Sequence, residues 1–391
     1  MSTLKVDAIR HNSATSDAIT TAADGTCTAK LTSVGGGGLS HRNIFINGAM
    51  TVAQRAVSST TNGYGSVDRF YVGYNAVQEA PTQAQADISA GTTPYTLGFR
   101  KSLKITNGNQ TSGAGAGEYI FINMPQEAQN LANSGWNYKS SSSFITLSFW
   151  IKSSVAQNFF FQFDVRDGTR QNYTMETGSL TADTWTKITK VIPGNSNLTI
   201  DNDNGVGAYV TFGVFWGTNY TASMSLETWG AANDSAKTPV NPTNWYNTND
   251  ATLEITGIQL EVGDTATSFE HRSYGEELKR CYRYFQRRTD DSNYQWVSLV
   301  SYYADSEIHG FFDHYEPMRA SPTLSTDTGS NTLAVQRAGG YAVFTTGLVK
   351  NGGNNNVTYY YRDGVTLGTS GQAGRCLTWS SGCNITLDAE L

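Results

Sequence analysis

The sequence predicts a mainly β fold, built around an antiparallel two-sheet sandwich with jelly-roll connections. Thr, Ser and Asn number 48, 36 and 30 among 391 residues, and Gly adds 39. Ser, Thr and Asn compete with helical hydrogen bonds, whereas Thr and aromatic residues suit a pleated surface. Aromatic residues reach 12%, enough for a packed core. Apolar and polar residues also alternate over many short segments separated by turn residues, which is typical of half-buried strands.

Length and charge narrow the classes of protein further. A chain of 391 residues exceeds the roughly 250–300 at which one hydrophobic core stops growing, so several domains are expected. A net charge of −6, without a block of Lys and Arg, disfavours binding to the phosphate backbone of nucleic acids. Because no apolar run of about 18–20 residues occurs and the start MSTLKVDAIRHNS lacks an apolar signal region, neither a membrane span nor a secretory signal is expected.

Residues 1–40 are predicted to form an arm rather than a domain. Leu4 and Val6 alternate, Ile9 follows, and a second alternating stretch, TCTAKLT, comes after a turn at Asp24-Gly25. Because residues 1–40 contain few large apolar side chains, they cannot bury enough surface to fold alone. The arm is therefore expected to pair with other copies or with a partner. The run Gly35 to Gly38 is predicted to be a flexible joint between arm and body.

Residues 41–272 are predicted to form the sandwich body. Seven strands are expected, with glycine-rich and Asn-rich connections: FRKSLKIT, EYIFINM, SFITLSFWIKS, FFFQFDV, WTKITKVI, AYVTFGVFWG and ATLEITGIQLEV. In FITLSFWIK, Ile145, Leu147, Phe149 and Ile151 share one face of a strand, as expected for residues that point into a core. Periodicity alone does not fix the order of the strands.

A single helix is expected within residues 273–291, a predicted helical neck. Ser273 and Glu276 have the spacing of a capping box, and Leu278, Cys281, Tyr282 and Phe285 form one apolar stripe. The β pattern returns over residues 292–391, which we expect to form a distal β tip domain. Cys376 and Cys383 bracket LTWSSG and could face each other across a hairpin, but two separate thiols are at least as consistent with a cytosolic origin.

Three segments resemble tail-fibre proteins of bacteriophages, especially marine, cyanophage-like ones. STLKVDAIRHNS with its turn-rich arm is similar to their virion-proximal end. HRNIFINGAMTVAQRA with GYGSVDRFYVG resembles the opening of phage fibre proteins whose body is a carbohydrate-binding-like jelly roll, with Phe70 where many relatives carry Trp. The segment LEITGIQLEVGDTATSFEHRSYGEELKRCYRYFQ resembles the stretch that closes this body and leads into a short helix. The matching residues there are Gln259, Leu260, Glu261, Gly263, Phe269, Glu270, Arg272, Ser273, Glu276, Cys281, Arg283, Tyr284 and Phe285.

The resemblance implies an elongated, trimeric virion protein, mounted on the phage tail and made in the host cytoplasm. Its expected function is adsorption to the bacterial host by binding a cell-surface glycan or lipopolysaccharide. The arm 1–40, through Leu4, Val6 and Ile9, would dock on tail adaptor or nozzle proteins. The stripe Leu278, Cys281, Tyr282 and Phe285 would pack either on its own sandwich or between three chains at a threefold axis, and the resemblance favours the second arrangement. A purely structural fibre or head decoration remains an alternative.

Glycan binding also has support from the residues themselves. Sugar rings present C–H patches that stack on flat aromatic faces, while amide, carboxylate and guanidinium groups satisfy the hydroxyls. Two turn-rich clusters combine these groups, one in the body and one in the tip. The resulting glycan-contact candidates are Trp229, Trp245 and Tyr246 in the body and Tyr359, Tyr361, Arg362 and Trp379 in the tip. Burial in a strand core is the competing interpretation for each ring, and loop positions favour exposure of Trp229, Trp245 and Trp379.

Other chemistry has weaker signals, so we expect no enzyme activity, no metal and no cofactor. The alternative enzymatic function is a polysaccharide depolymerase, which would need two carboxylates about 5–10 Å apart in a cleft. The candidate carboxylates are Asp164, Asp167 and Glu176, and solvated strand and turn carboxylates are the competing interpretation. No period of 20–30 residues indicates a β-helix. The run 201–205 (DNDNG) lacks the spacing of a calcium loop and is expected to be a turn. His309 and His314 point to opposite faces of one strand.

Overall fold

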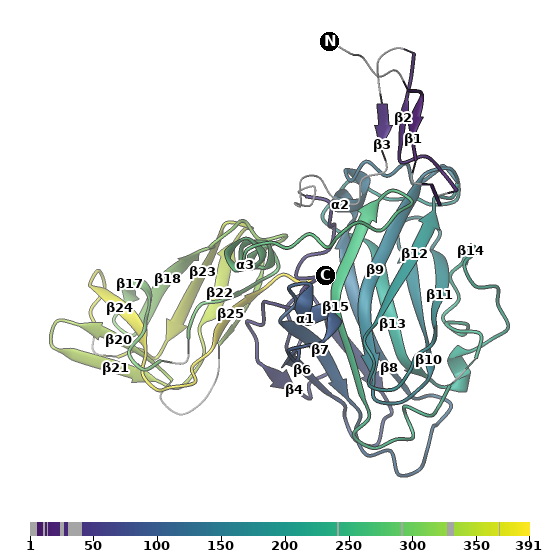
Figure 1. The fold of residues 1–391 in the computed structure, drawn as a ribbon. Helices are drawn as coiled ribbons and strands as arrows, with labels where there is room; N and C mark the ends of the chain where they lie inside the picture. Colours follow the sequence, from purple (N-terminus) through teal and green to yellow (C-terminus); the bar gives the residue numbers. More distant parts are fainter. Residues whose placement is uncertain are drawn as a thin grey trace.

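The computed structural model describes residues 6–10, 12–13, 15–23, 41–240, 242–290, 292–326, 332–366 and 368–391. For residues 27–29 it describes the backbone alone. In the arm, β1 (Ala8–Ile9), β2 (Ile19–Thr21) and β3 (Cys27–Ala29) form a small antiparallel sheet. This sheet projects from the body in Figure 1. Val6 and Ile9 are 41% and 53% exposed, whereas Leu4 and the run Gly35 to Gly38 lie outside the described residues.

Two six-stranded antiparallel sheets form the body, as the sequence predicts, and their arrangement is consistent with a jelly-roll sandwich (Figure 1). The first, which we call the β10 sheet, contains in spatial order β14 (Trp229–Ala231), β11 (Gln171–Ser179), β10 (Asn158–Val165), β13 (Val206–Trp216), β8 (Tyr119–Glu127) and β5 (Tyr71–Asn75). The second, the β9 sheet, contains β12 (Thr186–Pro193), β9 (Phe144–Ser153), β15 (Thr252–Val262), β7 (Lys101–Thr106), β6 (Thr82–Asp87) and β4 (Ser58–Ser59). All seven body strands predicted from alternation are present.

The core lies between these two sheets. Ile145, Leu147, Phe149 and Ile151 of β9 all point into it and are at most 1% exposed. The Phe149 ring packs edge-on against the rings of Phe161 and Phe212 from the opposite sheet, with centroids 5.1 Å and 4.7 Å away. The connections carry only short helical turns: α1 (Thr93–Thr96), α2 (Ala128–Ala132) and η1 (Thr218–Tyr220). Cross-sheet packing of alternating aromatic and aliphatic residues therefore holds the body together.

The predicted helix is α3 (Tyr274–Tyr282), and its capping box is present. The Ser273 hydroxyl accepts from the Glu276 N–H, and the Glu276 carboxylate accepts from the Ser273 N–H. Cys281 and Phe285 are buried within a single chain, at 0% and 4% exposure. The hypothesis that these two residues form a seam between three chains is therefore wrong, because both side chains pack on their own protomer. Leu278 and Tyr282 are half-buried and stay candidates for a seam.

A second β domain follows α3. A three-stranded sheet contains β16 (Phe285–Arg287), β25 (Ile385–Asp388) and β19 (Thr323–Thr326). A seven-stranded sheet, the distal sheet below, contains in order β21 (Gly340–Phe344), β20 (Leu333–Arg337), β24 (Ala373–Thr378), β17 (Trp296–Ala304), β18 (Glu307–Asp313), β23 (Val357–Asp363) and β22 (Val349–Gly353). The two sheets enclose a separate core. Because β16 already pairs with β25, part of the predicted neck 273–291 belongs to this domain.

The chain returns to the body after β25, and Figure 1 shows its end lying there. The Glu390 carboxylate pairs with the guanidinium groups of Arg69 and Arg55, and all three side chains are at most 11% exposed. Arg55 also pairs with Asp388 at 2.9 Å. Asp68, fully buried beside Arg55, has a pKa raised to about 6, because burial outweighs the charge of Arg55 and the hydrogen bonds from Gln54. A buried ionic cluster thus joins the distal domain to the body.

Candidate functional site

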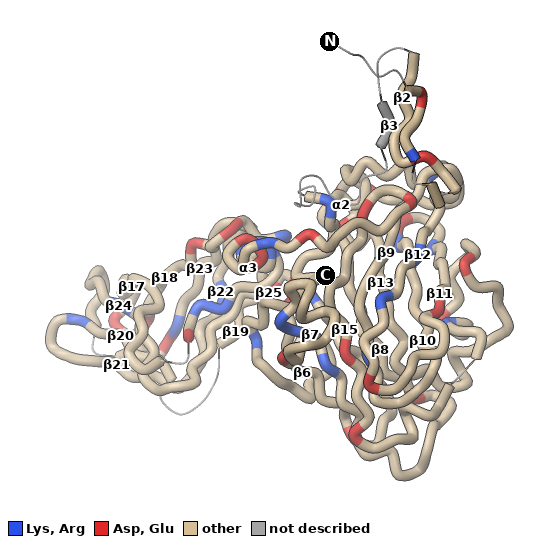
Figure 2. The backbone as a smooth tube through the Cα atoms, in the orientation of Figure 1, with Lys and Arg blue, Asp and Glu red and all other residues tan. Residues whose placement is uncertain are grey.

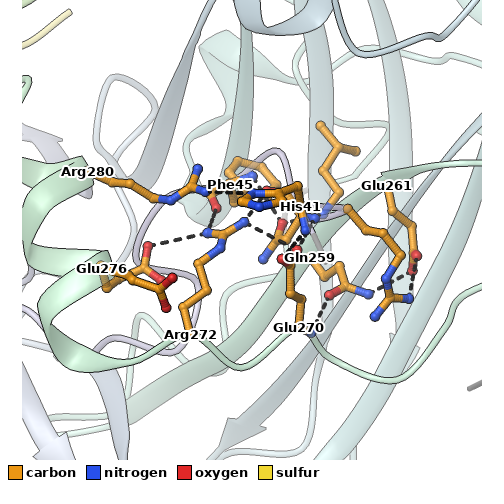
Figure 3. Close-up of polar contacts among 12 residues, drawn as sticks. His41, Phe45, Gln259, Glu261, Glu270, Arg272, Glu276 and Arg280 are labelled. Carbon is orange, nitrogen blue, oxygen red and sulfur yellow. Dashed lines mark hydrogen bonds and ion pairs between the residues drawn. The ribbon is translucent and has the colours of Figure 1, made fainter. Parts of the chain in front are cut away.

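The residues that resemble the closing segment of phage fibre proteins form a polar clasp, shown in Figure 3. The Glu270 carboxylate accepts hydrogen bonds from the backbone N–H groups of His41 and Asn43. Arg272 donates to the carbonyl oxygens of Asn43 and Phe45. The Glu270 N–H in turn donates to the side-chain oxygen of Gln259, on β15, at 2.8 Å. The clasp therefore binds the first residues of the body to its closing strand and to α3.

Every charged group of the clasp has a partner inside it. Burial alone would raise the pKa of Glu270, but hydrogen bonds from Asn43 and His41 and the charge of Arg272 hold it below its ordinary value. Arg272 pairs with Glu270 and with Glu277, and its side chain is 5% exposed. Glu261 pairs with Arg42 and accepts from the Thr267 N–H. Carboxylates committed in this way stabilise the fold of this chain.

The structure corrects the prediction for Trp245 and Tyr246, because both side chains are fully buried. The Tyr246 ring stacks on Phe215 with centroids 3.9 Å apart, and its hydroxyl donates to Glu118 at 2.8 Å. The Asn107 side chain donates to three backbone carbonyls of this loop, those of Trp245, Tyr246 and Thr248. Satisfied backbone groups let a polar-looking loop fold into the core, so neither ring is available to a sugar.

Trp229 and the aromatic rings on the outer face of the β10 sheet present little free ring surface. Trp229 is half-buried, packs on the core, and donates its indole N–H to the Pro193 carbonyl at 2.7 Å. On the outer face of the β10 sheet, Phe121 stacks against Trp216 at 5.5 Å and an interplanar angle of 11°, and against Tyr71 at 6.1 Å and 17°. Rings stacked on one another have their faces occupied, so a sugar would meet mainly their edges.

The distal sheet differs, because its outer face carries exposed rings. Leu299 and Tyr303 of β17 are each 69% exposed, and Phe311 of β18 and Tyr359 of β23 are 49% and 50% exposed. Phe311 and Tyr359 are register partners on adjacent strands, and no other ring contacts either one within the part of the chain that the structure describes. We call these four residues the distal apolar row. The tip candidate Tyr359 is therefore part of an open aromatic surface.

Polar groups line the distal apolar row. Ser301, His309 and Tyr361 are register partners across β17, β18 and β23, one pleat away from the row. His309 stacks on Tyr303 with centroids 4.7 Å apart, and the imidazole contacts the Glu307 carboxylate at 2.7 Å. A shallow groove of about 520 Å³ is lined by Leu299, Phe311 and Tyr359 of the row, by Ser301 and His309, and by Asn351, whereas Tyr303 and Tyr361 lie outside its lining. Flat rings beside hydroxyl, amide and imidazole groups are the chemistry that a sugar requires.

The other two tip candidates do not join this groove. Arg362 lies on the opposite side of β23 from Tyr359 and Tyr361, since side chains alternate along a strand, and it donates to the Gly347 carbonyl. Trp379 is half-buried between Tyr294 and Tyr341, with centroids 5.4 Å and 5.3 Å away. Of the seven glycan-contact candidates, only Tyr359 and Tyr361 are brought together on one surface.

The carboxylates considered for hydrolysis do not form a matched pair. Asp164 pairs with Arg166 and Arg170, and Glu176 accepts from the Asn158 amide. In the pairing of β10 with β11, Asp164 is opposite Asn172, which is four residues from Glu176. At about 3.3 Å per residue, Asp164 and Glu176 are therefore separated by about 13 Å along the strands. The pKa of Asp167 is raised, first by burial and then by Asp201 and Asp203, while its carboxylate accepts from the Asp201 N–H. This arrangement lacks the separation that glycoside hydrolysis requires.

The described ranges also offer few side chains suited to metal binding or to thiol chemistry. No group of three or more His, Cys, Asp or Glu side chains there could hold a metal ion. The run 201–205 forms a turn in which Asp203 accepts from the Gly205 N–H. Cys376 and Cys383 are buried in the distal core, and no disulfide joins them. Burial raises the pKa of Cys376 to about 12, so this thiol stays protonated at neutral pH.

Leu299, Tyr303, Phe311 and His309 were not predicted as site residues from the sequence. The signal was present in WVSLVSYY, where apolar residues occupy both faces of one strand. A strand at the surface needs only one apolar face, so Leu299 and Tyr303 on the second face indicate an exposed apolar surface.

No protein-family model matches the chain, and no curated protein matches it. Among solved structures, it is similar to the enzymatically active domain of tailspike protein 4 of bacteriophage CBA120, at 9% identity and a TM-score of 0.30 over 56% of this chain and 21% of that one. A structure described as "CBM4 structure and function" matches at 12% identity and a TM-score of 0.28, over 56% and 98% of the two chains. A sugar-binding protein of Bacteroides thetaiotaomicron matches at 10% identity and a TM-score of 0.31, over 57% of this chain and 100% of that one.

This chain therefore spans about a fifth of the tailspike domain that it matches. At such low identities and TM-scores, the function has to be argued from the residues of this chain alone. No helix in the portions that the structure describes is long and apolar enough to cross a membrane.

Proposed function

We propose that this protein is a phage tail fibre that adsorbs the virion to a bacterial surface by binding glycan, without cleaving it. The distal apolar row carries the proposal, because it presents open ring faces next to hydrogen-bonding groups. β17, which carries Leu299 and Tyr303 of the row, contains no Lys, Arg, Asp or Glu, as its tan tube in Figure 2 illustrates, so this strand places no charge beside a neutral sugar. The depolymerase alternative has less support, since Asp164 is ion-paired with two arginines and lies four strand positions from Glu176.

Weak single sites suit this function. A shallow, open groove buries little of a ligand, so each site is expected to bind modestly. Several sites on one particle convert modest affinity into firm capture, with gains of about 10²–10⁴ when the sites can engage together. Tail mounting through the arm and assembly into a trimer are parts of the same proposal. The exposed Val6 and Ile9 support the first part, because short strands with open edges gain most from a partner.

Substitution of the exposed rings of Tyr359 and Phe311 tests the proposal. Tyr359→Ala and Phe311→Ala should each weaken binding to an array of bacterial surface polysaccharides at least tenfold, about 1.4 kcal/mol, because a stacking face is lost. The matched control is Tyr274→Ala, which removes a tyrosine of similar exposure, 58%, from α3. Incubation with the bound polysaccharide should release no new reducing ends.

Two outcomes would contradict this function. Unchanged binding in both ring variants would exclude the distal apolar row, and shortened polysaccharide would establish a depolymerase. An apolar face can also be an interface between copies, so light scattering should accompany the assay. If Tyr359→Ala changes the oligomeric mass and Tyr274→Ala does not, the face is a subunit interface instead.

A further inference from the structure

A separate cleft lies on the body, at the edge of the β9 sheet beside the clasp. Its volume is about 560 Å³, within the range of about 300–1,000 Å³ that is usual for small-ligand sites. The floor includes Ser148 and Gly257, and Trp150 and Lys187 line it from β9 and β12. Arg280 of α3 also lines it, and Figure 3 shows how this side chain lies beside His41. None of these residues belongs to the distal apolar row.

One wall of the cleft consists of three rings that contact one another. Phe99, Phe269 and His271 have centroids 4.9–5.0 Å apart. Gly257 makes this wall possible, because it lies at an irregularity of β15 with φ +62° and a Cβ there would meet the Phe99 ring at 2.6 Å. The imidazole of His271 is anchored by the Leu97 carbonyl at 2.9 Å. The wall is therefore a built feature of the fold.

Trp150 provides an open aromatic face in this cleft. It is half-buried on the outer side of β9, and no other ring contacts it in the described portion of the chain. Its indole N–H likewise has no hydrogen-bond partner among the described residues. Lys187 is the register partner of Trp150 on β12, so the exposed ammonium and the indole are neighbours on the same face. A sugar stacked on this indole would have a cation beside it.

The charges of the cleft do not cancel locally. Glu270 is committed to His41, Asn43 and Arg272, and Glu276 is committed to the capping box of α3. Lys187 and Arg280 have no carboxylate within 4.0 Å in the ranges that the structure describes, and the contact of Arg280 is with the His41 Nδ1 at 3.2 Å. The carboxylates are thus held by the fold, whereas two cations remain available to a ligand.

We propose that this cleft binds an acidic saccharide, with a sugar ring on Trp150 and its anionic group held by Lys187 and Arg280. The site is independent of the distal apolar row and does not rest on the function proposed for that row. An anionic sugar explains both features together, because neutral sugars need no cation and simple anions need no stacking face. A carboxylate and a phosphate share this chemistry, so the probes must distinguish them.

Calorimetric titration of the full chain tests the site with three probes. Hexagalacturonate carries carboxylates, its fully methyl-esterified form has the same rings without charge, and pentamannose monophosphate carries a phosphate. We expect one or both charged probes to bind at least tenfold more tightly than the ester, and rising salt to weaken that binding. Whichever charged probe binds identifies the anionic group. Equal binding of the ester, or no binding of either charged probe, would overturn the proposal.

Substitutions then place the probe in the cleft. Trp150→Ala, Lys187→Gln and Arg280→Gln should each weaken binding of the charged probe at least tenfold, and Lys187→Gln should also reduce its salt dependence. The matched control is Lys139→Gln, an exposed lysine outside the cleft, which should bind as the unsubstituted chain does. If Tyr359→Ala abolishes binding while the three cleft variants keep it, the probe is bound by the distal sheet and the inference fails. Loss of polysaccharide binding in Tyr359→Ala alone concerns only the adsorption proposal.

Discussion

The body and the distal sheet use similar aromatic residues in opposite ways. Trp245 and Tyr246 of the body are 0% exposed, although they lie in an Asn-rich loop, whereas Tyr303 and Tyr359 of the distal sheet are 69% and 50% exposed, although they lie in strands. The body has a second sheet and an amide side chain, Asn107, to enclose its rings. The outer face of the distal sheet has neither. Available partners, rather than local composition, decide which rings are exposed.

The same contrast holds for charge. The body contains the clasp and the Arg55, Arg69 and Glu390 cluster, both buried, so charged groups there fix the arrangement of segments. On the outer face of the distal sheet, His309 and Glu307 form a half-exposed pair, and His309 lines the shallow groove. Buried pairs specify structure, and exposed groups are free to meet a ligand.

The largest effect is expected when the clasp is broken. Arg272→Ala would leave Glu270 and two backbone carbonyls without their buried partner, which costs about 3–5 kcal/mol of unfolding free energy. Urea denaturation followed by tryptophan fluorescence measures this loss. Arg100→Ala is the matched control, since Arg100 also donates to two carbonyls but is exposed, and its cost should stay below about 1 kcal/mol. Equal losses in the two variants would show that the clasp has no special role.

A smaller, pH-dependent effect is expected at Asp68. Its native pKa of about 6 exceeds the ordinary value of 3.8, so the folded state binds the proton more tightly than the unfolded state. The cost of ionisation is fully present above pH 6 and is relieved as the pH falls towards 4, by at most about 3 kcal/mol. Asp68→Asn removes this titration, so the difference in unfolding free energy between variant and parent should change across this window. A difference that is constant from pH 8 to pH 4.5 would show an ordinary carboxyl.

The smallest effect is expected when a tyrosine hydroxyl is removed, in one variant from the body and in another from the distal sheet. Tyr246→Phe removes a hydroxyl that donates to Glu118 in the body core, and should cost about 1–2 kcal/mol of unfolding free energy. Tyr303→Phe removes an exposed hydroxyl from the distal sheet, and should change it by less than about 0.5 kcal/mol. Thermal denaturation of both variants suffices. A larger loss in Tyr303→Phe would mean that the distal face is covered in solution.

Much of the fold could be predicted from the sequence, because alternation and caps are local signals. The core face of β9, with Leu147 and Phe149, and the capping box of Ser273 and Glu276 are confirmed. The body strands β4, β5, β6, β11 and β14 were not predicted, and the sequences TQAQAD of β6 and QNYTMETGS of β11 carry few large apolar residues. Neighbouring strands, rather than their own pattern, place them in a sheet.

The sites were less predictable, because they depend on contacts between distant residues. Burial of Trp245 requires the Asn107 side chain, 138 positions earlier. Cys281 and Phe285 of the predicted stripe are covered by their own chain, which periodicity cannot distinguish from an interchain seam. Tyr359 and Phe311 meet only through the register of β18 and β23. The cleft brings Arg280 of α3 together with Lys187 of β12, a pairing that no local pattern contains.

The pairing of β16 with β25 has a consequence for how such a molecule can be varied. These two strands are the entry and the exit of the distal domain, and they are hydrogen-bonded neighbours beside the body. A unit whose two connections emerge together can be replaced as a cassette without moving the rest of the polypeptide. Under the proposed function, exchange of the segment between Phe285 and Asp388 would change the glycan preference in one step and leave residues 1–272 unaltered.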